Sequence, residues 1–353
     1  MSDSRRVLIL SASVGEGHDA PARVLAEALR EHVEVGVVDS LQLMGPLLEA
    51  VASSGMRVSF GSSGMSWLFD LEYLLFARLP VTRRLGQELL YRVAGDRLLT
   101  AVEMASPDVV VSTYPVATEV LGHLRATGRL DTPVCAAITD LAALRYWAHP
   151  GCDLHLVAHP ESIPEVERIA GRGSARAVRG LTDPRFYEPL TRAEAEAPVV
   201  AVSGGGWGVG DLEGAVTEVL GITLVTVLCL CGRNEEVRAQ IAERFATDRV
   251  RALGFIDDMP ALLAGADVIV HSTAGLTVLE ALMLGCRVVS YGAGIGHVRV
   301  NNRAFERLGL ATVVRERGGL RAAVEQALAA PRRSRVEEFA ALPEARDLVL
   351  DLL

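Results

Sequence analysis

The sequence predicts an α/β protein with two doubly wound, Rossmann-like domains. Short β-branched, almost continuously apolar runs alternate with helical patterns over nearly the whole chain of 353 residues, as is typical of parallel sheets covered on both faces. The alternation falls into two blocks of about six strands each, and the segment between them is rich in proline and charge. We therefore expect two domains that face each other across a cleft.

The strands and domains follow from this alternation. We expect strands at residues 7–11, 33–39, 109–112, 134–139, 154–157, 175–178, 199–203, 224–231, 250–253, 268–271, 288–291 and 311–314. The predicted parts are an N-terminal domain 1–180, a linker 181–198, a C-terminal domain 199–331 and a helical tail 332–353. Ligands of such sheets bind beyond the carboxyl ends of the strands.

Composition limits the class of protein. A net charge of −9 argues against a nucleic-acid binder, which usually carries a basic face. The odd cysteine count, mostly inside apolar runs, indicates reduced thiols in a cytoplasmic protein, and Cys229 and Cys231 lack the second pair that a zinc site needs. The start MSDSRR has no signal-peptide core, and no apolar run is long enough for a transmembrane span.

Residues 41–100 interrupt the strand–helix rhythm. They contain aromatic and leucine residues beside arginines, for example in MSWLFDLEYLLFARLPVTRRLGQELLYRV. Such a pattern fits a helical segment that lies at an anionic membrane surface, peripherally on the inner face of the cell membrane. An ordinary helical insertion packed on the sheet is the alternative.

The first glycine loop, in SASVGEGHDAPARVLAEAL at residues 11–29, supports two hypotheses. Gly15, Gly17 and Ala20 fit the dinucleotide pattern G-x-G-x-x-A, and Asp39 follows at the distance of a ribose-binding acid. Alternatively, His18 lies where the loop becomes a helix. The positive end of a helix favours a neutral imidazole, which can take a proton from an incoming hydroxyl.

Two further loops follow strands in the second half. SGGGWGVGDL at residues 203–212 fits no dinucleotide register, but its glycines offer backbone N–H groups to an anion; a tight turn without a ligand is the alternative. Ser272, Thr273, Ala274 and Gly275 then open a helix whose start can hold a diphosphate. Glu280 lies farther along that helix, where a carboxylate can accept both hydroxyls of a ribose, unless it merely belongs to a solvated helix face.

At this point the chain resembles the family of monogalactosyldiacylglycerol synthases and processive diacylglycerol glucosyltransferases, relatives of the peptidoglycan lipid I N-acetylglucosaminyltransferase. The resemblance covers nearly the whole sequence. It is carried by GEGHDAPARVLAEAL, PDVVVSTYPVATEVL, TDLAALRYWAHPGCDLHLVAHPES, GGGWGVG, GFIDDMPALLAGADVIV and TAGLTVLEALMLGCRVV. It implies a GT-B fold and an inverting transfer from a UDP-sugar to a lipid hydroxyl at the membrane surface, without an obligatory metal or other cofactor.

The resemblance also implies roles for individual residues. His18 matches the family's loop histidine and becomes the catalytic base, with Asp140 as orienter or alternative base, and Arg233 matches a turn that stabilises the departing UDP. The acceptor loop comprises Gly15, Gly17 and Tyr114. The donor side comprises Gly204, Gly205, Gly206, Gly208, Arg233, Asn234, Gly254, Phe255, Ser272, Thr273, Ala274, Gly275, Thr277, Glu280, His297 and Asn301.

The sequence departs from the family pattern at three places. Ser272 and Thr273 replace a lysine-proline pair, with Ala274 in place of the first glycine. His297 replaces the glutamine of a Gln-x-x-x-Asn motif, and no histidine follows the TD of TDLAALRYW.

We therefore predict a UDP-sugar-dependent hexosyltransferase that acts on a lipid acceptor. The alternatives are a transferase for a soluble natural product, a nucleotide-sugar epimerase or NAD-dependent enzyme, and an inactive nucleotide-binding scaffold.

Overall fold

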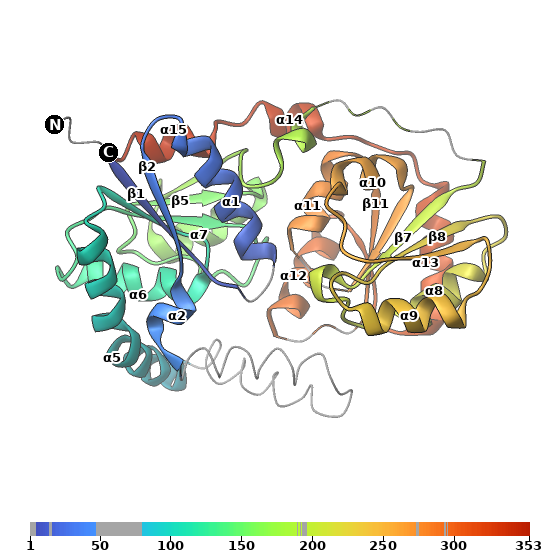
Figure 1. The fold of residues 1–353 in the computed structure, drawn as a ribbon, viewed down its shortest axis with the longest axis horizontal. Coiled ribbons are helices and arrows are strands. Elements are labelled where there is room, and N and C mark those ends of the chain that lie inside the picture. The colour runs from blue at the N-terminus through green and yellow to red at the C-terminus, as the bar shows by residue number, and fades with distance from the viewer. Residues whose placement is uncertain are drawn as a thin grey trace. The chain divides into compact units, whose positions relative to one another are not determined.

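The computed structural model describes residues 5–13, 16–46, 80–188, 190, 192, 196–272, 275–292, 294 and 296–353 (Figure 1). They form two compact units. The first comprises Met1–Asp183 with Leu342–Leu353, and the second Pro184–Ala341. Each unit contains a parallel six-stranded sheet with helices packed on it, so the predicted class of two α/β domains is confirmed.

In the first unit the strand order is β2-β1-β3-β4-β5-β6. The strands are β1 (Arg6–Ser11), β2 (Glu34–Asp39), β3 (Val109–Ser112), β4 (Val134–Ile138), β5 (Leu154–Val157) and β6 (Ala175–Ala177). The helices are α1 (Glu16–Arg30), α2 (Ser40–Met44), α5 (Pro80–Ala105), α6 (Pro115–Ala126), α7 (Ile163–Ala170) and α15 (Ala345–Leu350), with a 3₁₀ turn, η2 (Pro160–Ser162).

In the second unit the order is β12-β11-β10-β7-β8-β9. The strands are β7 (Val199–Ser203), β8 (Thr226–Leu230), β9 (Val250–Leu253), β10 (Val268–His271), β11 (Arg287–Tyr291) and β12 (Thr312–Val314). The helices are α8 (Leu212–Leu220), α9 (Glu235–Arg244), α10 (Met259–Gly265), α11 (Leu276–Met283), α12 (Gly296–Arg307), α13 (Leu320–Ala329) and α14 (Val336–Ala340); the 3₁₀ turns are η3 (Pro184–Tyr187), η4 (Gly205–Trp207) and η5 (Arg317–Gly319).

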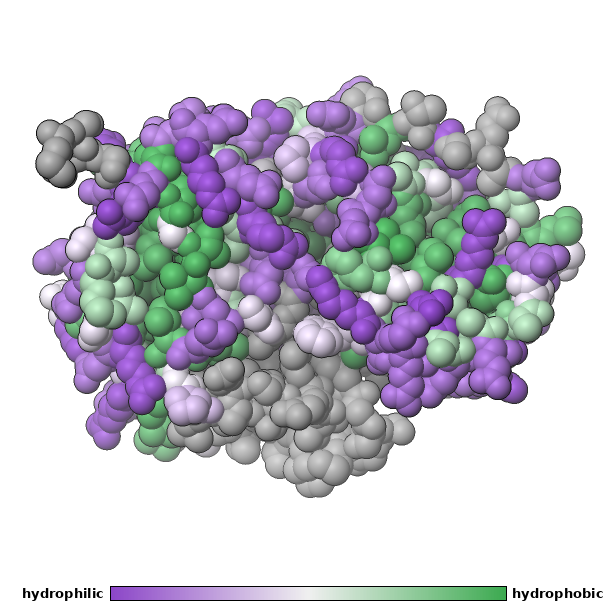
Figure 2. Space-filling model, in the orientation of Figure 1, coloured by the Kyte–Doolittle hydropathy of each residue, from purple (hydrophilic) through white to green (hydrophobic). Residues whose placement is uncertain are grey.

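The apolar runs form strands because they are buried from both sides. Every residue of β3, β4 and β10 is buried, which a strand achieves only when helices cover both faces of its sheet. All of the predicted strands are present, with ends that differ by one or two residues at most. The edge strand β2 is the contrast: Val37 and Val38 remain exposed, and apolar side chains gather over this part of the first unit in Figure 2.

The C-terminal segment 332–353, expected as one helical tail, is divided between the units. α14 lies in the second unit, whereas α15 lies in the first, where Val349 is fully buried and α15 contacts α1. Arg179 fixes the returning chain: its N–H donates to the carbonyl of Pro343, its carbonyl accepts from the N–H of Ala345, and its guanidinium pairs with Glu344 at 3.0 Å. No local signal in the sequence distinguishes the two halves of this segment.

The predicted membrane-facing segment lies largely outside the described residues, which lack 47–79. Its last part is α5, whose Ala94, Leu98 and Val102 are buried in the core of the first unit. Among the described helices, none combines the length and the apolarity needed to cross a bilayer.

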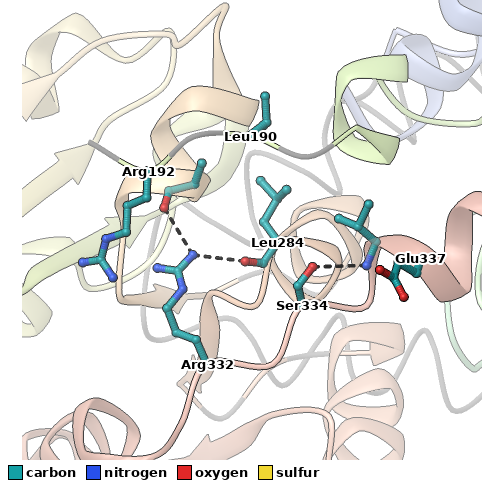
Figure 3. A pocket seen from close by; sticks show the side chains of 8 residues that line it. Leu190, Arg192, Leu284, Arg332, Ser334 and Glu337 are labelled. Atoms are coloured by element: carbon teal, nitrogen blue, oxygen red, sulfur yellow. Dashed lines mark hydrogen bonds between the residues drawn. The ribbon is translucent and has the colours of Figure 1, made fainter. Parts of the chain in front are cut away.

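A pocket of about 340 Å³ lies in the second unit beside residues that precede β7 and β10 (Figure 3). Its Arg332 donates to the carbonyls of Ala264 (3.2 Å), Leu284 (3.1 Å) and Ala266, which end or follow α10 and α11. Arg192 pairs with Asp267 at 2.8 Å. A cation stabilises the negative ends of helices, so these arginines have structural partners, at the sheet edge opposite to the one where such folds bind ligands.

We expect Arg332→Met to lower the free energy of unfolding of the second unit by about 2 kcal/mol, because three partly buried carbonyls lose their donor. Urea unfolding followed by hydrogen exchange in β10 and β11 measures this effect. Arg333→Met, at the exposed neighbouring position, is the matched control. Equal stability of the two variants would contradict the structural role of Arg332.

His149 makes the stability of the first unit sensitive to acid. Its Nδ1 accepts a hydrogen bond from the N–H of Gly151 at 3.0 Å, and its ring packs on Gly122, where a Cβ atom would lie 2.5 Å from the ring. Burial, together with the nearby His123 and His155, lowers the pKa of His149 to about 4. The folded unit therefore holds a neutral imidazole at pH values where the unfolded chain binds a proton.

The first unit should accordingly lose stability as the pH falls from about 6.5 to about 4, by on the order of 2 kcal/mol for this partly exposed ring. Above that window the contribution is fully present, since neither state is protonated. His149→Asn keeps an acceptor for Gly151 but does not titrate, so it should flatten the dependence of the unfolding free energy on pH. An unchanged slope in this variant would assign the acid sensitivity to other groups.

Candidate functional site

The carboxyl edge of the first sheet gathers residues from three adjacent strands. α1 begins just after β1 and carries His18, Thr113 and Tyr114 follow β3, and Asp140 follows β4. Because β1, β3 and β4 are neighbours in a parallel sheet, their carboxyl ends lie side by side. The strand order therefore brings together three of the predicted residues: His18, Tyr114 and Asp140.

The carbonyl of Thr113 fixes the tautomer of His18. His18 Nδ1 lies 2.9 Å from the carbonyl oxygen of Thr113. A carbonyl only accepts hydrogen bonds, so Nδ1 carries the proton and Nε2 is the basic atom of the neutral ring. The half-buried imidazole also meets the ring of Tyr114 edge-on, with centroids 5.2 Å apart. This arrangement can accept a proton at a defined atom.

Trp147 links His18 to Asp140, and sequence analysis did not single it out. Its ring lies 5.6 Å from that of His18, and its Nε1–H donates to Oδ2 of Asp140 at 2.9 Å. The indole is only 2% exposed, so its position is fixed by packing. Asp140 is therefore joined to this cluster through the indole. The motif TDLAALRYW contains both Asp140 and Trp147, and it was the sequence feature from which Trp147 could have been predicted.

Asp39, the acid that the dinucleotide hypothesis assigns to a ribose, has backbone partners instead. Asp39 caps α2, with its carboxylate accepting from the N–H groups of Leu41 (2.8 Å) and Gln42 (3.4 Å), and it also accepts from Ser13 N–H at 3.2 Å. Gly15 lies outside the described residues, and Gly17 is exposed in the first turn of α1. The carboxylate that the hypothesis reserves for a ribose thus shapes the local backbone.

The carboxyl edge of the second sheet carries the predicted donor residues. β10, β7, β8 and β9 are consecutive neighbours. The loops that follow them hold Ser272–Gly275, Gly204–Gly210, Gly232–Asn234 and Gly254–Phe255. All four loops therefore begin at one edge of the sheet.

The glycines of the 204–210 loop serve close packing between loops. A Cβ on Gly208 would lie 2.2 Å from the carbonyl oxygen of Cys231, and both Gly208 and Gly232 have positive φ angles. Gly206 accepts from Arg233 N–H at 2.9 Å. The N–H groups of Gly204, Gly205 and Gly208 donate to Leu230 O, Ser203 Oγ and Gly205 O. The expectation of bare N–H groups is therefore wrong at these three positions, because the tight turn uses them itself.

Arg233 and Phe255 form an exposed cation–π pair. The guanidinium carbon lies 3.7 Å from the ring centroid, and Phe255 is 37% exposed. Such contacts orient a cation without neutralising it. The neighbouring Asn234 has a structural role: its Oδ1 caps α9 by accepting from Val237 N–H at 3.1 Å. The predicted leaving-group cation and the predicted aromatic of the nucleotide site are thus in contact.

The loop after β10 joins the glycine loop to α11. Ser272 Oγ donates to the carbonyl of Val209 at 2.9 Å, so this hydroxyl ties the two loops together. Thr273 and Ala274 lie outside the described residues, while Gly275 caps α11. Thr277 and Glu280 are half-buried on α11, whose Leu279 and Ala281 are buried. Glu280 therefore lies neither in the core nor on a fully solvated face.

His297 and Asn301, the residues predicted to contact the sugar, differ in exposure. His297 is exposed at the start of α12, whereas Asn301 is 1% exposed and donates from Nδ2 to the carbonyl of His297 at 3.2 Å. The adjacent Asn302, which sequence analysis missed, is also buried and accepts from Ser290 Oγ at 2.8 Å. Both asparagines thus stabilise α12 and its approach to β11, and only His297 presents an open side chain.

Positive charge is available at the carboxyl edge of the second sheet. Within the described part of the chain, no three His, Cys, Asp or Glu side chains are grouped as metal ligands. Arg233 supplies positive charge, and the start of α11 supplies the positive end of a helix.

Comparisons with known proteins agree with the sequence resemblance. Residues 18–180 match the family model of monogalactosyldiacylglycerol (MGDG) synthase, and residues 208–341 match that of glycosyl transferases group 1. The processive diacylglycerol β-glucosyltransferases of Bacillus subtilis (strain 168) and Bacillus pumilus (strain SAFR-032) are 26% and 25% identical. Each alignment covers 89% of this chain and 84% of the relative.

Solved structures share the fold. Spinosyn rhamnosyltransferase SpnG superposes with a TM-score of 0.66 at 14% identity, covering 98% of this chain and 99% of that one. MurG of Acinetobacter baumannii gives a TM-score of 0.59 at 17% identity, covering 99% of this chain and 98% of that one. Each half of the chain thus matches a glycosyltransferase family model, and each half contains a parallel six-stranded sheet, as predicted. The chain is a hexosyltransferase of the GT-B fold, similar in sequence to the monogalactosyldiacylglycerol synthase model and to processive diacylglycerol glucosyltransferases.

Proposed function

We propose that the protein transfers a hexose from a UDP-sugar to a hydroxyl of a lipid such as diacylglycerol, with inversion at the anomeric carbon. The names of the Bacillus relatives support a diacylglycerol acceptor, and the complex of SpnG with thymidine diphosphate supports a nucleoside diphosphate donor. The observation that carries the mechanism is the bond between His18 Nδ1 and Thr113, which leaves Nε2 as the base.

In this mechanism the acceptor hydroxyl gives its proton to His18 Nε2 while its oxygen attacks the anomeric carbon. The bond from that carbon to UDP breaks, and the electron pair leaves with the diphosphate. The Thr113 carbonyl stabilises the imidazolium that forms, because its oxygen faces the Nδ1–H. Trp147 packs beside the same ring and donates to Asp140, so its indole joins that carboxylate to the cluster.

The second unit supplies the donor site in this proposal. Arg233 and the start of α11 stabilise the charge that develops on the departing UDP, since fixed dipoles and cations aimed at that charge lower the barrier. Phe255, which is partly exposed beside Arg233, contacts the nucleotide base, and Glu280 accepts from the ribose hydroxyls. No bound cofactor is required beyond the sugar donor.

Substitution of the base separates chemistry from donor binding. We expect His18→Ala to lower kcat about 10²- to 10⁴-fold while the Kd for UDP, measured by calorimetry, stays unchanged. Turnover is followed by mass spectrometry of diacylglycerol mixed with a panel of UDP-sugars. His32→Ala, at an exposed position in the same unit, is the control. A His18→Ala protein that turns over normally, or that loses UDP affinity in parallel, would contradict the assignment.

The outer face of α5 supports docking on an anionic membrane. Leu85 and Leu89 are 67% and 63% exposed one helical turn apart. The exposed Arg84 lies beside them, and the exposed Arg92 pairs with Glu88 at 2.9 Å. Two exposed leucines beside a basic residue, on a helix whose other side is buried, offer an apolar contact to a membrane surface. We propose that this face holds the enzyme against the bilayer that contains the acceptor.

Replacing both leucines by serine should therefore reduce binding to phosphatidylglycerol-containing vesicles about tenfold, because less apolar area enters the interface. Co-sedimentation measures the bound fraction, and activity on a short-chain, soluble diacylglycerol should not change. Met104→Ser, which alters an equally exposed residue at the other end of α5, serves as the control. Unaltered protein that stays in the supernatant would instead favour a soluble acceptor.

A further inference from the structure

A cluster of three side chains lies at the carboxyl edge of the second sheet, outside every predicted site residue. Tyr291 ends β11, Arg317 begins η5 after β12, and Asp211 follows the glycine loop and caps α8. Tyr291 donates from its hydroxyl to Asp211 Oδ2 at 2.7 Å. Arg317 donates to the same oxygen from Nη2 at 2.7 Å and from Nε at 3.2 Å.

Capping a helix explains only part of this arrangement. Asp211 Oδ1 accepts from Gly214 N–H at 2.9 Å, which is the bond that an N-cap makes. The other oxygen collects donors from two distant elements, and Tyr291 is 7% exposed. Burial by itself would raise the pKa of Asp211, but the hydrogen bonds from Tyr291 and Arg317 lower it.

The first turn of α8 is shaped to admit this contact. A Cβ on Gly214 would lie 2.2 Å from Asp211 Oδ2 and 2.3 Å from Arg317 Nη2. Glycine inside a helix is unfavourable by about 1 kcal/mol relative to alanine. Its presence here is explained by the guanidinium that lies across the turn.

The cluster holds the glycine loop from the side opposite to Arg233. β10 lies between β11 and β7, so the bond from Tyr291 to Asp211 passes over the end of β10. Gly210, next to Asp211, packs so closely on Ser272 that a Cβ would lie 2.8 Å from Oγ. The loop 204–210 is therefore held by the Arg233 N–H at Gly206 on one side and adjoins Asp211 on the other, with Ser272 packed against it.

We infer that Asp211 is a positioning residue for the donor, whose carboxylate, through Tyr291 and Arg317, holds the glycine loop in the shape that receives a nucleoside diphosphate. The inference rests on the proposed UDP-sugar donor. It predicts that loss of the bonds to Tyr291 and Arg317 weakens donor binding, even where the helix cap is kept.

Asp211→Ser makes that separation, because serine caps a helix as well as aspartate but is too short to reach the two partners. We expect the Kd for UDP and the KM for the donor to rise about tenfold, with kcat at saturating donor within about twofold of the parent. Tyr291→Phe should raise both constants by a smaller factor. The double variant should match Asp211→Ser, since both changes act through one carboxylate.

Asp258→Ser is the matched control. Asp258 likewise caps a helix, α10, by accepting from Ala261 N–H, and likewise pairs with an arginine, Arg185, at 2.9 Å. We expect it to leave the Kd for UDP unchanged. Wild-type UDP affinity in Asp211→Ser, or equal losses in Asp211→Ser and Asp258→Ser, would overturn the inference alone. Absence of UDP binding by the unaltered protein would overturn the proposed donor and, with it, this inference.

Discussion

Parallel strand pairing is the constraint on which both candidate sites depend. Every strand in a parallel sheet delivers its following loop to the same edge, so residues far apart in sequence meet there without any local signal. In the first unit this brings His18 to the carbonyl of Thr113, 95 residues away. In the second it aligns four loops beside one another. The chemistry of each site is thus a consequence of strand order.

A backbone carbonyl orients the histidine of the first site. A carboxylate often orients a catalytic histidine, but here a main-chain carbonyl accepts the Nδ1–H. Such a carbonyl cannot be removed by a side-chain substitution, and it is fixed by β3. The negative charge is one contact farther away, on Asp140, and Trp147 keeps it there.

Arginines at the two edges of the second sheet have different surroundings. At the amino-terminal edge, Arg332 donates to carbonyls at helix ends, and Arg192 faces Asp267. At the carboxyl edge, Arg233 lies over the ring of Phe255. Arg332 and Arg192 thus contact groups within the fold, whereas the proposed diphosphate cation contacts an aromatic side chain.

The sequence by itself determined the fold class, the strands and the loops that carry the sites. Continuous apolar runs report burial on both faces, and glycine-rich stretches after strands report turns, so both are visible locally. Only the tertiary structure decided the tautomer of His18, the contact of Trp147 with Asp140 and the return of α15 to the first unit. It likewise decided the bonds of Asp211 to Tyr291 and Arg317, 80 and 106 residues away. These contacts depend on which strands become neighbours, and periodicity along the chain contains no information about that order.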